Sequence, residues 1–428
     1  MTVPSARPLE PRPDVRPGGP PAPAPWTVER IGGPAAFEAL RPEWDELLAA
    51  SPADELFLTW EWLYTWWWHL GRRGPTAGPR RLALLAVRRG GELTALAPWA
   101  VAPSRSWHPL PGRTLQLLGT GTVGSDYLDV VLRPGREEGA AAVLAGWLAE
   151  RRGVVELEQI ERGRASALRV ARRLQAWGWT AVERPGNVCP CAELAGATWE
   201  GYLASLGASH RQNVRRRLRK LHRAFRVDLH RAETEDEAAA AFDVLVELHH
   251  RRWGDRGGSD ALDDPAVVAF HRDVVRLAAR RGWLRLYVLY LDGRPAAALY
   301  GFLYRGRFLF YQSGFDPGFA RHSVGLVMMG LSIRDAIADG AREYDLLHGD
   351  EPYKHLWANG SRELGRLELY PPSAAGAVRR GLREARLTAR GAVRGARDVR
   401  DVLERGLDPA ARALRRRLRP GGHPGGRG

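Results

Sequence analysis

Three apolar segments that follow one another almost without a gap constrain the fold of this chain most. They lie at residues 284–291, 294–304 and 307–314, and the dipeptides Asp292-Gly293 and Arg305-Gly306 separate them. Two-residue turns of this kind, between segments with alternating apolar residues, predict β-hairpins. We therefore expect an antiparallel, three-stranded meander.

A loop, a helix and further strands follow the meander. The periodicity of apolar residues predicts a loop at 316–324, a helix at 325–339, a strand at 343–347, a short helix near 352–358 and a final strand at 364–370. Strands and helices in this order are typical of a mixed α/β fold.

The length of 428 residues indicates two globular units with tails. For the first unit the pattern predicts strands at 26–31, 81–87, 93–101, 127–132 and 154–160, and helices at 35–49, 59–70, 137–151 and 164–177. Before the meander, the second unit adds helices at 199–225, 235–253 and 264–281 and a strand at 226–231. The expected division is a disordered leader over 1–25, a first domain over 26–192, a second domain over 193–372 and a tail over 373–428.

Composition supports buried cores and argues against export. Hydrophobic residues make up 44% of the chain and include 16 Trp, which is ample for burial. The Pro-rich leader lacks the apolar run of a signal peptide, and charged residues interrupt every candidate membrane helix. We therefore expect a cytoplasmic protein.

The cysteines and histidines do not predict a metal site. Only Cys189 and Cys191 occur, too few for a four-ligand zinc site or a disulfide framework. The pair His249-His250 has no carboxylate or thiol partner at a suitable spacing. Both cysteines are expected to be buried small side chains, and no metal is expected.

The net charge of +15 is mostly a property of the tail. Residues 373–428 hold 15 Arg and five acidic residues, so two thirds of the excess lies there. Apolar residues in the tail recur at spacings of three and four, which predicts an Arg-rich amphipathic helix. Two alternatives stay open: peripheral contact with an anionic membrane at its inner face, or packing on the protein itself.

The loop before the predicted helix at 325–339 is suited to an anion. It reads Asp316-Pro317-Gly318-Phe319-Ala320-Arg321-His322-Ser323-Val324-Gly325. Such a loop presents unpaired N–H groups and the positive end of the helix dipole, and Arg321 adds charge. It is a candidate site for a pyrophosphate, although many loops contain Gly simply to turn the chain.

This order of elements, with R-x-x-x-G entering a helix, resembles the acyl-CoA-binding motif of the GNAT (N-acetyltransferase) superfamily. Those enzymes splay two parallel strands apart around the pantetheine arm. The resemblance implies that 307–314 and 343–347 are the splayed strands, although the loop has one Gly and an extra residue compared with the commonest motif. It implies cofactor contacts from Gln312, Ser313, Gly314, Arg321, His322, Ser323, Val324 and Gly325.

More specifically, the chain resembles the CelD/BcsL family, whose domain is also described as BioF-like and is related to the FemAB peptidyltransferases. The matching landmarks span about 300 residues. They are the segments 57–63, with Trp66, 209–221 and 344–357, the last containing G-D-x-x-Y-K. The resemblance implies tandem acetyltransferase-like domains, each a mostly antiparallel twisted sheet flanked by helices, with acyl-CoA, expected to be acetyl-CoA, bound in the second alone.

Acyl transfer to an amine needs a polarised carbonyl, a base for the amine and an acid for the leaving thiolate. N–H groups near Gln312 and Ser313 are candidates to polarise the carbonyl. Asp350 and His348 are alternative candidate bases. The resemblance to the acetyltransferase superfamily implies that Tyr353 is the acid that protonates the thiolate. The resemblance implies that Lys354 pairs with a phosphate or carboxylate of the acceptor, while Tyr353 and Asp350 are also compatible with a core aromatic and a helix cap.

Other aromatic and basic residues are candidates for contact with the acceptor, which is expected to be a small or sugar-linked amine. They are His249, Trp253, Tyr311 and Trp357. The Trp cluster at 60–68 fits a stacking platform or, alternatively, packing between the two domains. The basic run 211–223 fits contact with phosphates, tRNA included, or a solvated helix face.

The leading hypothesis is an N-acetyltransferase that uses acetyl-CoA on an amine of a sugar or cell-envelope precursor, as in exopolysaccharide biosynthesis. One alternative is a FemAB-like transfer of an aminoacyl group from tRNA, the one reading in which a nucleic acid is a partner. Another is a non-catalytic binding protein that its basic tail anchors to a membrane or an assembly.

Overall fold

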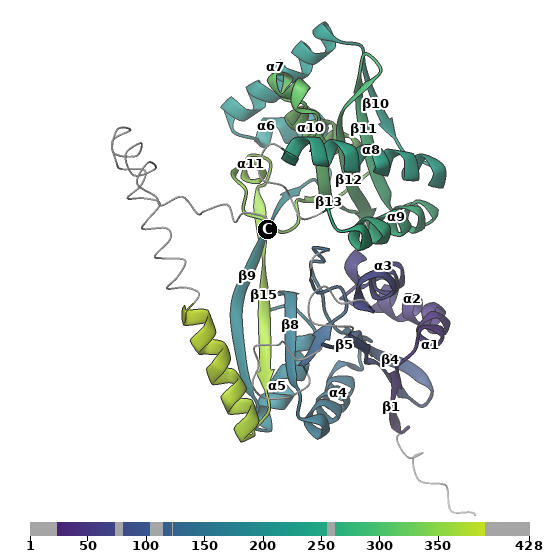
Figure 1. The fold of residues 1–428 in the computed structure, drawn as a ribbon, viewed down its shortest axis with the longest axis vertical. Helices are drawn as coiled ribbons and strands as arrows, with labels where there is room; N and C mark the ends of the chain where they lie inside the picture. Colours follow the sequence, from purple (N-terminus) through teal and green to yellow (C-terminus); the bar gives the residue numbers. More distant parts are fainter. Residues whose placement is uncertain (1–23, 73–79, 103–113, 122, 255–261, 390–428) are drawn as a thin grey trace, which may run out of the picture.

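The computed structural model of the chain describes residues 24–72, 80–102, 114–121, 123–254 and 262–389. Within these ranges the strands form two sheets, one in the order β1-β3-β4-β7 and one of 11 strands in the order β10-β11-β12-β13-β14-β9-β15-β8-β6-β5-β2 (Figure 1). Helices flank both sheets. The predicted mixed α/β fold is confirmed, with most strand pairs antiparallel and the pairs β6–β8 and β13–β14 parallel.

The first half contains the predicted helices and strands with several corrections. The strands predicted at 81–87 and 93–101 are each two strands, the second pair divided at Pro98, and only Val131–Leu132 of the strand predicted at 127–132 is extended. The strands Thr114–Leu117 and Thr180–Glu193 were not predicted. The strands are β1 (Trp26–Ile31), β2 (Arg81–Leu82), β3 (Leu84–Arg89), β4 (Glu92–Ala97), β5 (Trp99–Ala102), β6 (Thr114–Leu117), β7 (Val131–Leu132), β8 (Val154–Glu161) and β9 (Thr180–Glu193). The helices are α1 (Pro34–Ala39), α2 (Arg41–Ala50), α3 (Trp60–Trp66), α4 (Glu137–Arg151) and α5 (Ala167–Ala176), and π-helical η2 (Trp67–Gly71) continues α3. The single helix predicted at 35–49 is two helices, because Pro42 has no N–H to donate and lies in the first turn of α2.

The second half follows the predicted order, except that the single helix predicted at 199–225 is divided into two at Leu206 and Gly207, and the backbone of Leu206 is extended. Its strands are β10 (Val227–Arg231), β11 (Leu284–Leu291), β12 (Arg294–Tyr304), β13 (Arg307–Phe315), β14 (Glu343–Asp345) and β15 (Gly360–Tyr370). Its helices are α6 (Trp199–Ser205), α7 (Ala208–Ala224), α8 (Glu235–Gly254), α9 (Pro265–Arg280), α10 (Val324–Ala338) and α11 (Pro352–His355), with the 3-10 helix η4 (Pro317–His322) before α10.

Both predicted hairpins of the meander are confirmed. Asp292 and Gly293 have φ angles of 51° and 78°, and Arg305 and Gly306 have φ angles of 51° and 77°. Positive φ at both central residues is the hallmark of the type I′ turn, whose twist matches that of the flanking strands.

The two halves share one sheet through the long strands β9 and β15. The last strand, β15, pairs with β8 and β9 of the first half, and the end of β9 pairs with β14 of the second (Figure 1). The final strand, assigned by sequence to the second unit, thus lies between strands of the first. The domain boundaries stay a prediction.

Strands β13 and β14 run parallel for only three residue pairs. Arg307, Phe308 and Leu309 lie opposite Glu343, Tyr344 and Asp345, and the pairing ends there. Beyond it, β13 stays paired with β12 on its other edge as far as Phe315. The two strands are therefore open toward each other from Phe310 and Leu346 onward, as the resemblance implied.

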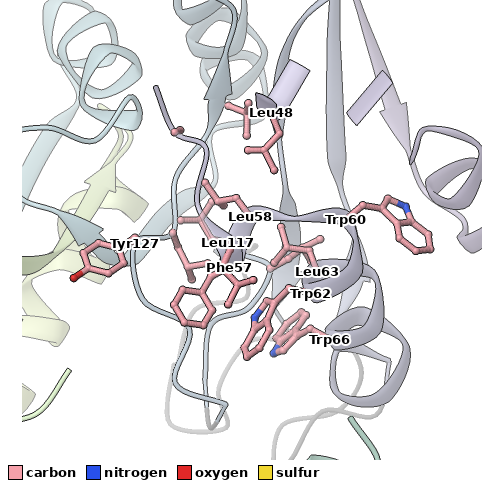
Figure 2. Packing of buried hydrophobic residues seen from close by; sticks show 14 of the residues in the cluster. Leu48, Phe57, Leu58, Trp60, Trp62, Leu63, Trp66, Leu117 and Tyr127 are labelled. Carbon is pink, nitrogen blue, oxygen red and sulfur yellow. The ribbon is translucent and has the colours of Figure 1, made fainter. Parts of the chain in front are cut away.

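The Trp cluster is mostly buried, and Trp62 packs between the two halves. Trp62 is 1% exposed and makes edge-to-face contacts with Phe270 and Phe302 of the second half, with ring centroids 5.0 and 6.0 Å apart. Figure 2 shows Trp62 and Trp66 within the buried cluster. Aromatic pairs of this geometry add about 0.5–1.5 kcal/mol each beyond the area they bury. Trp62 and Trp66 therefore have a packing role in the core, whereas Trp68 is 47% exposed.

The first part of the tail, residues 374–389, is helical. Its Arg383 donates to Glu368 of β15 at 3.2 Å, and Glu384 pairs with Arg184 of β9. This part packs on the protein itself, and residues 390–428 lie outside the described ranges. No described helix combines the length and the apolar character that a membrane span requires.

Candidate active site

A cavity of about 390 Å³ lies where β13 and β14 separate. One wall is residues 310–313 of β13, and the facing wall is residues 346–348, which follow β14. Helix α11 and the segment before it contribute Glu351, Tyr353 and Lys354. The volume falls in the range of small-molecule sites. The open strand edges thus line a space suited to an extended ligand.

The cavity has an exposed mouth and a buried end. Tyr353 at the mouth is 39% exposed, whereas Tyr300 and His271 at the other end are each 1% exposed. Arg252 of α8 lies on the wall and donates from Nη1 to Oγ of Ser313 at 3.4 Å. Charged groups therefore gather on the wall and at the mouth, and aromatic side chains form the buried end.

Lys354 is a buried cation in the cavity wall. Its side chain is 5% exposed, and Nζ lies 2.7 Å from the carbonyl oxygen of His348 and 3.2 Å from a carboxylate oxygen of Glu351. Gly349 makes room for this ammonium, since a Cβ there would lie 2.8 Å from Nζ and would overlap the Glu351 carboxylate. Gly349 also has a φ of 125°, which disfavours any side chain.

Tyr353 keeps its phenolic proton. Burial and the negative charge of Glu351 raise its pKa to about 12. At neutral pH it is a neutral O–H group at the mouth of the cavity, able to donate a hydrogen bond or a proton to an anion.

His348 pairs with Asp126, a residue of the first half that the sequence reasoning missed. Nδ1 of His348 lies 2.9 Å from Oδ1 of Asp126, whose Oδ2 accepts the His348 backbone N–H at 2.8 Å. Asp126 is completely buried and also accepts from Gln159 at 2.9 Å. Its hydrogen bond raises the pKa of His348. This partner fixes the proton on Nδ1 and leaves Nε2 as the acceptor nitrogen.

The neighbouring residue, Tyr127, holds the same loop. Its hydroxyl donates to Asp345 at 2.7 Å, and Asp345 also accepts from Arg307 at 2.9 Å. Tyr127 and Leu347 both have positive φ, at 55° and 52°, a conformation unusual for residues with bulky side chains. The segments around 126 and 347 are thus held in strained conformations by contacts between them.

Two of the predicted cofactor residues on β13 line the cavity, namely Gln312 and Ser313. The Ser313 N–H donates to Oε1 of Gln312 at 2.9 Å. A ligand carbonyl can use this N–H only if the Gln312 side chain moves. Gly314 does not line the cavity. It allows α8 to approach β13, since a Cβ there would lie 2.6 Å from the backbone nitrogen of His249.

The remaining predicted cofactor residues form the entry to α10. Arg321 and His322 end η4, Ser323 has a φ of 57°, and Val324 and Gly325 begin α10. Ser323 makes no side-chain capping bond to the first turn. From α7, Arg217 donates to the carbonyl oxygen of Arg321 at 3.1 Å. The first turn of α10 therefore keeps its N–H groups available beside two arginines.

Of the predicted catalytic and acceptor-binding residues whose side chains are described, three do not line the cavity. Asp350 is exposed and accepts from His355 at 2.6 Å. His249 is 1% exposed in α8, and burial lowers its pKa to about 4. Trp357 is 2% exposed and packs edge-on to His210, because the chain turns into the core after the four residues of α11. The side chain of Trp253 lies outside the described part of the chain.

Tyr311 lines the cavity as predicted for an acceptor contact. Tyr300, His271 and Asp126 are further members of the site that sequence reasoning missed. Gly119, Gly121 and Gly124, which precede Asp126, all have positive φ and mark an unusual loop in the first half. That Gly-rich run was the available sequence signal for Asp126.

Comparison with known proteins gives a family match over part of the chain. Residues 208–355 match the model of the acetyltransferase (GNAT) domain. This part of the chain is therefore similar to a GNAT domain and has a GNAT-type acyltransferase fold. No curated protein matches the sequence.

Several solved structures are similar to this protein over most of its chain. The crystal structure of FemX has 12% identity and a TM-score of 0.56, covering 80% of this chain and 96% of that chain. A protein of unknown function from Bacteroides thetaiotaomicron VPI-5482 has 11% identity and a TM-score of 0.50, covering 80% of this chain and 100% of that chain. A tandem GNAT protein from the clavulanic acid biosynthesis pathway has 13% identity and a TM-score of 0.43, covering 82% of this chain and 100% of that chain. The narrower CelD/BcsL resemblance stays a prediction.

Proposed function

We propose that this protein is an acyl-CoA-dependent N-acyltransferase that transfers an acetyl group to an amine of a sugar or cell-envelope precursor by direct attack on the thioester. The observation that carries the proposal is the opening between β13 and β14. Their pairing ends at Leu309 and Asp345, and the cavity lies directly beyond. The choice of acceptor rests on the CelD/BcsL resemblance alone.

The strand edges, backbone N–H groups and arginines around the opening fit CoA. The pantetheine arm is extended and largely uncharged, which suits a cavity between two strand edges. The pyrophosphate is a dianion, which suits the first turn of α10 with Arg321 and Arg217 beside it. Acyl-CoA supplies an acyl group already activated as a thioester.

In the proposed reaction, His348 removes the proton from the attacking amine through Nε2. Asp126 holds the imidazole in that tautomer and stabilises the imidazolium that forms. The amine nitrogen bonds to the carbonyl carbon, and the carbon–sulfur bond breaks. Tyr353 gives its proton to the departing thiolate and is then reprotonated from solvent.

Lys354 supplies positive charge beside the reacting groups. Its ammonium is fixed by the carbonyl of His348 and the carboxylate of Glu351. A fixed cation in a mostly buried wall stabilises negative charge on the thioester oxygen or on an acceptor carboxylate without having to reorganise.

Turnover assays test the proposal. Acetyl-CoA with a panel of amino sugars is expected to release free CoA, and aminoacyl-tRNA with the same acceptors is expected to give no product. Release of CoA by wild type but not by His348→Gln supports the proposal. Absence of CoA binding at millimolar concentration in calorimetry contradicts it.

A second candidate is a FemAB-like transfer from aminoacyl-tRNA. The observation that favours it is the outer face of α7, which exposes Arg215, Arg216, Arg219, Lys220 and Arg223. A cationic helix face of this kind fits an RNA backbone. Product from aminoacyl-tRNA, lost when Arg216, Arg219 and Arg223 are changed to Gln together, would favour this candidate over acetyl-CoA.

The third sequence-based hypothesis was a non-catalytic protein anchored by its tail. It predicts that removal of residues 373–428 abolishes function, whereas the enzyme proposal predicts that acetyl transfer by the purified protein survives this deletion. The part of the tail described here contacts Glu368 and Arg184, so thermal unfolding of the deletion variant must be measured as well.

A further inference from the structure

Two residues at the buried end of the cavity carry polar atoms whose hydrogen-bonding capacity the described part of the chain does not use. Tyr300 and His271 line the cavity and are each 1% exposed. Within the described residues, neither the Tyr300 hydroxyl nor Nδ1 of His271 has a hydrogen-bond partner. Buried polar atoms in folded proteins nearly always have one. Both atoms belong to residues that line the same cavity, which points to a ligand group that supplies the missing hydrogen-bond partners.

The neighbouring contacts determine what each atom offers. The single proton of the Tyr311 hydroxyl is donated to the carbonyl oxygen of Val123. The same hydroxyl lies 3.2 Å from Nε2 of His271, so it accepts the proton on that nitrogen. Nδ1 of His271 is therefore an acceptor. The Tyr300 hydroxyl carries a proton and acts as a donor.

The two residues with unused polar atoms, Tyr300 and His271, are uncharged. Burial lowers the pKa of His271 to about 3 and raises that of the Tyr300 hydroxyl, so both are neutral at neutral pH. Phe242 and Phe302 pack around them, with ring centroids 6.1 and 5.0 Å from that of Tyr300. An ion moved into such surroundings loses its hydration without gaining a counter-charge. Cationic and anionic ligand groups are thus favoured at the mouth, beside Lys354 and Glu351, and disfavoured here.

We propose that the buried end is a subsite for an uncharged ligand group that both donates and accepts hydrogen bonds, namely a hydroxyl or an amide. The group donates to Nδ1 of His271 and accepts from Tyr300. The inference rests on the proposed function in one respect: the group belongs to one of the two molecules in acyl transfer, either to the acyl chain of the donor or to the amine acceptor.

Two matched pairs of probes distinguish these sources. 3-Hydroxybutyryl-CoA against butyryl-CoA tests a hydroxyl on the acyl chain. Glucosamine against cyclohexylamine tests hydroxyls on a six-membered ring that carries the amine. The dissociation constant of each is measured by calorimetry for wild type and Tyr300→Phe. Wild type is expected to bind the hydroxylated member of one pair about tenfold more tightly, as one added hydrogen bond to a buried group allows.

Tyr300→Phe removes one oxygen atom and keeps the ring. Because the hydroxyl has no partner within the described chain, the unliganded variant is expected to unfold at the same temperature as wild type or higher. It should lose the preference for the hydroxylated probe and keep its affinity for CoA. Tyr304→Phe is the matched control, since that hydroxyl donates to Asp54 at 2.5 Å outside the cavity. The control is expected to lose stability and to keep the preference.

Three results would overturn the subsite. Wild type could show no preference in either pair, Tyr300→Phe could keep the preference, or a crystal structure with the preferred probe could place only water beside Tyr300 and His271. If CoA binds while neither pair is discriminated, the subsite fails and the proposed function stands. If CoA does not bind and the preference for glucosamine persists, the subsite stands and the proposed function fails.

Discussion

Nδ1 of His348 lies 2.9 Å from Oδ1 of Asp126, although the two residues are 222 positions apart in the chain. Asp126 belongs to the first half of the protein, and His348 follows a strand of the second. The candidate base is therefore oriented by the half that was expected to bind no cofactor. Both halves are needed to assemble the site.

Replacing Asp126 by Asn is expected to lower the pKa of His348, because the carboxylate that raises it is lost. In wild type kcat/KM should rise with pH as His348 loses its proton, and this limb should move to lower pH in the variant. The maximal rate should fall by about 10²-fold or more, as for loss of general base catalysis. NMR titration of the His348 ring measures the pKa directly.

Asp350→Asn is the control for this prediction, since Asp350 is exposed and pairs with His355 outside the cavity. It should leave the His348 titration and the rate unchanged. An unaltered titration curve in Asp126→Asn would show that the pair does not set the pKa of His348.

Lys354→Arg is expected to lose about tenfold or more in activity although it keeps the charge. The space for Nζ is closed by Gly349 and two carbonyl oxygens, and a planar guanidinium does not replace a compact ammonium. Gly349→Ala should act similarly and also destabilise the fold by about 1–3 kcal/mol, because of its φ of 125°. Steady-state kinetics and denaturant unfolding check both. Full activity in Lys354→Arg would mean that charge alone suffices.

Arg217→Gln is expected to weaken CoA binding by about tenfold, the typical effect of losing one hydrogen bond to a charged group. Binding of pantetheine, which has no pyrophosphate, should not change. Calorimetry with both ligands measures the difference. Arg219→Gln, on the exposed face of the same helix, is the control. Equal losses of affinity for CoA and for pantetheine would show that the pyrophosphate does not bind beside Arg217.

His271 is expected to make the protein sensitive to acid. Burial lowers its pKa from 6.5 to about 3, so the unfolded chain binds a proton before the folded chain does. Stability is then full above about pH 6.5 and falls as the pH drops toward 3, by about 2 kcal/mol at about pH 5. His271→Gln should lose less stability between pH 7 and about pH 5 in urea unfolding, because Gln does not titrate. An identical loss in the variant contradicts this assignment.

Much of the second half was predictable from sequence because its signals are local. The dipeptides at 292–293 and 305–306 determine their own turns, and the loop before α10 follows directly from β13. The candidates Tyr353 and Lys354 lie within one short motif that follows β14. A correct prediction of that strand therefore also places both residues at the cavity.

The rest depends on pairings between distant segments, which no local pattern specifies. The placement of β15 between β8 and β9 is set by the register of long strands. Asp350 and His348 were equally good bases by sequence. The structure distinguishes them, because His348 lines the cavity beside the buried carboxylate of Asp126, whereas Asp350 pairs with His355 outside it. Trp357 was placed in the acceptor site as an aromatic after the motif, but the turn after α11 directs it into the core beside His210.

The most direct test of the proposed acyl-CoA site is a crystal structure with acetyl-CoA. The pantetheine arm is expected between residues 310–313 and 346–348, with its sulfur near Tyr353 and its pyrophosphate on the first turn of α10. Acetyl-CoA bound at another surface, or a slot that stays closed by the Gln312 side chain at saturating ligand, would contradict the account.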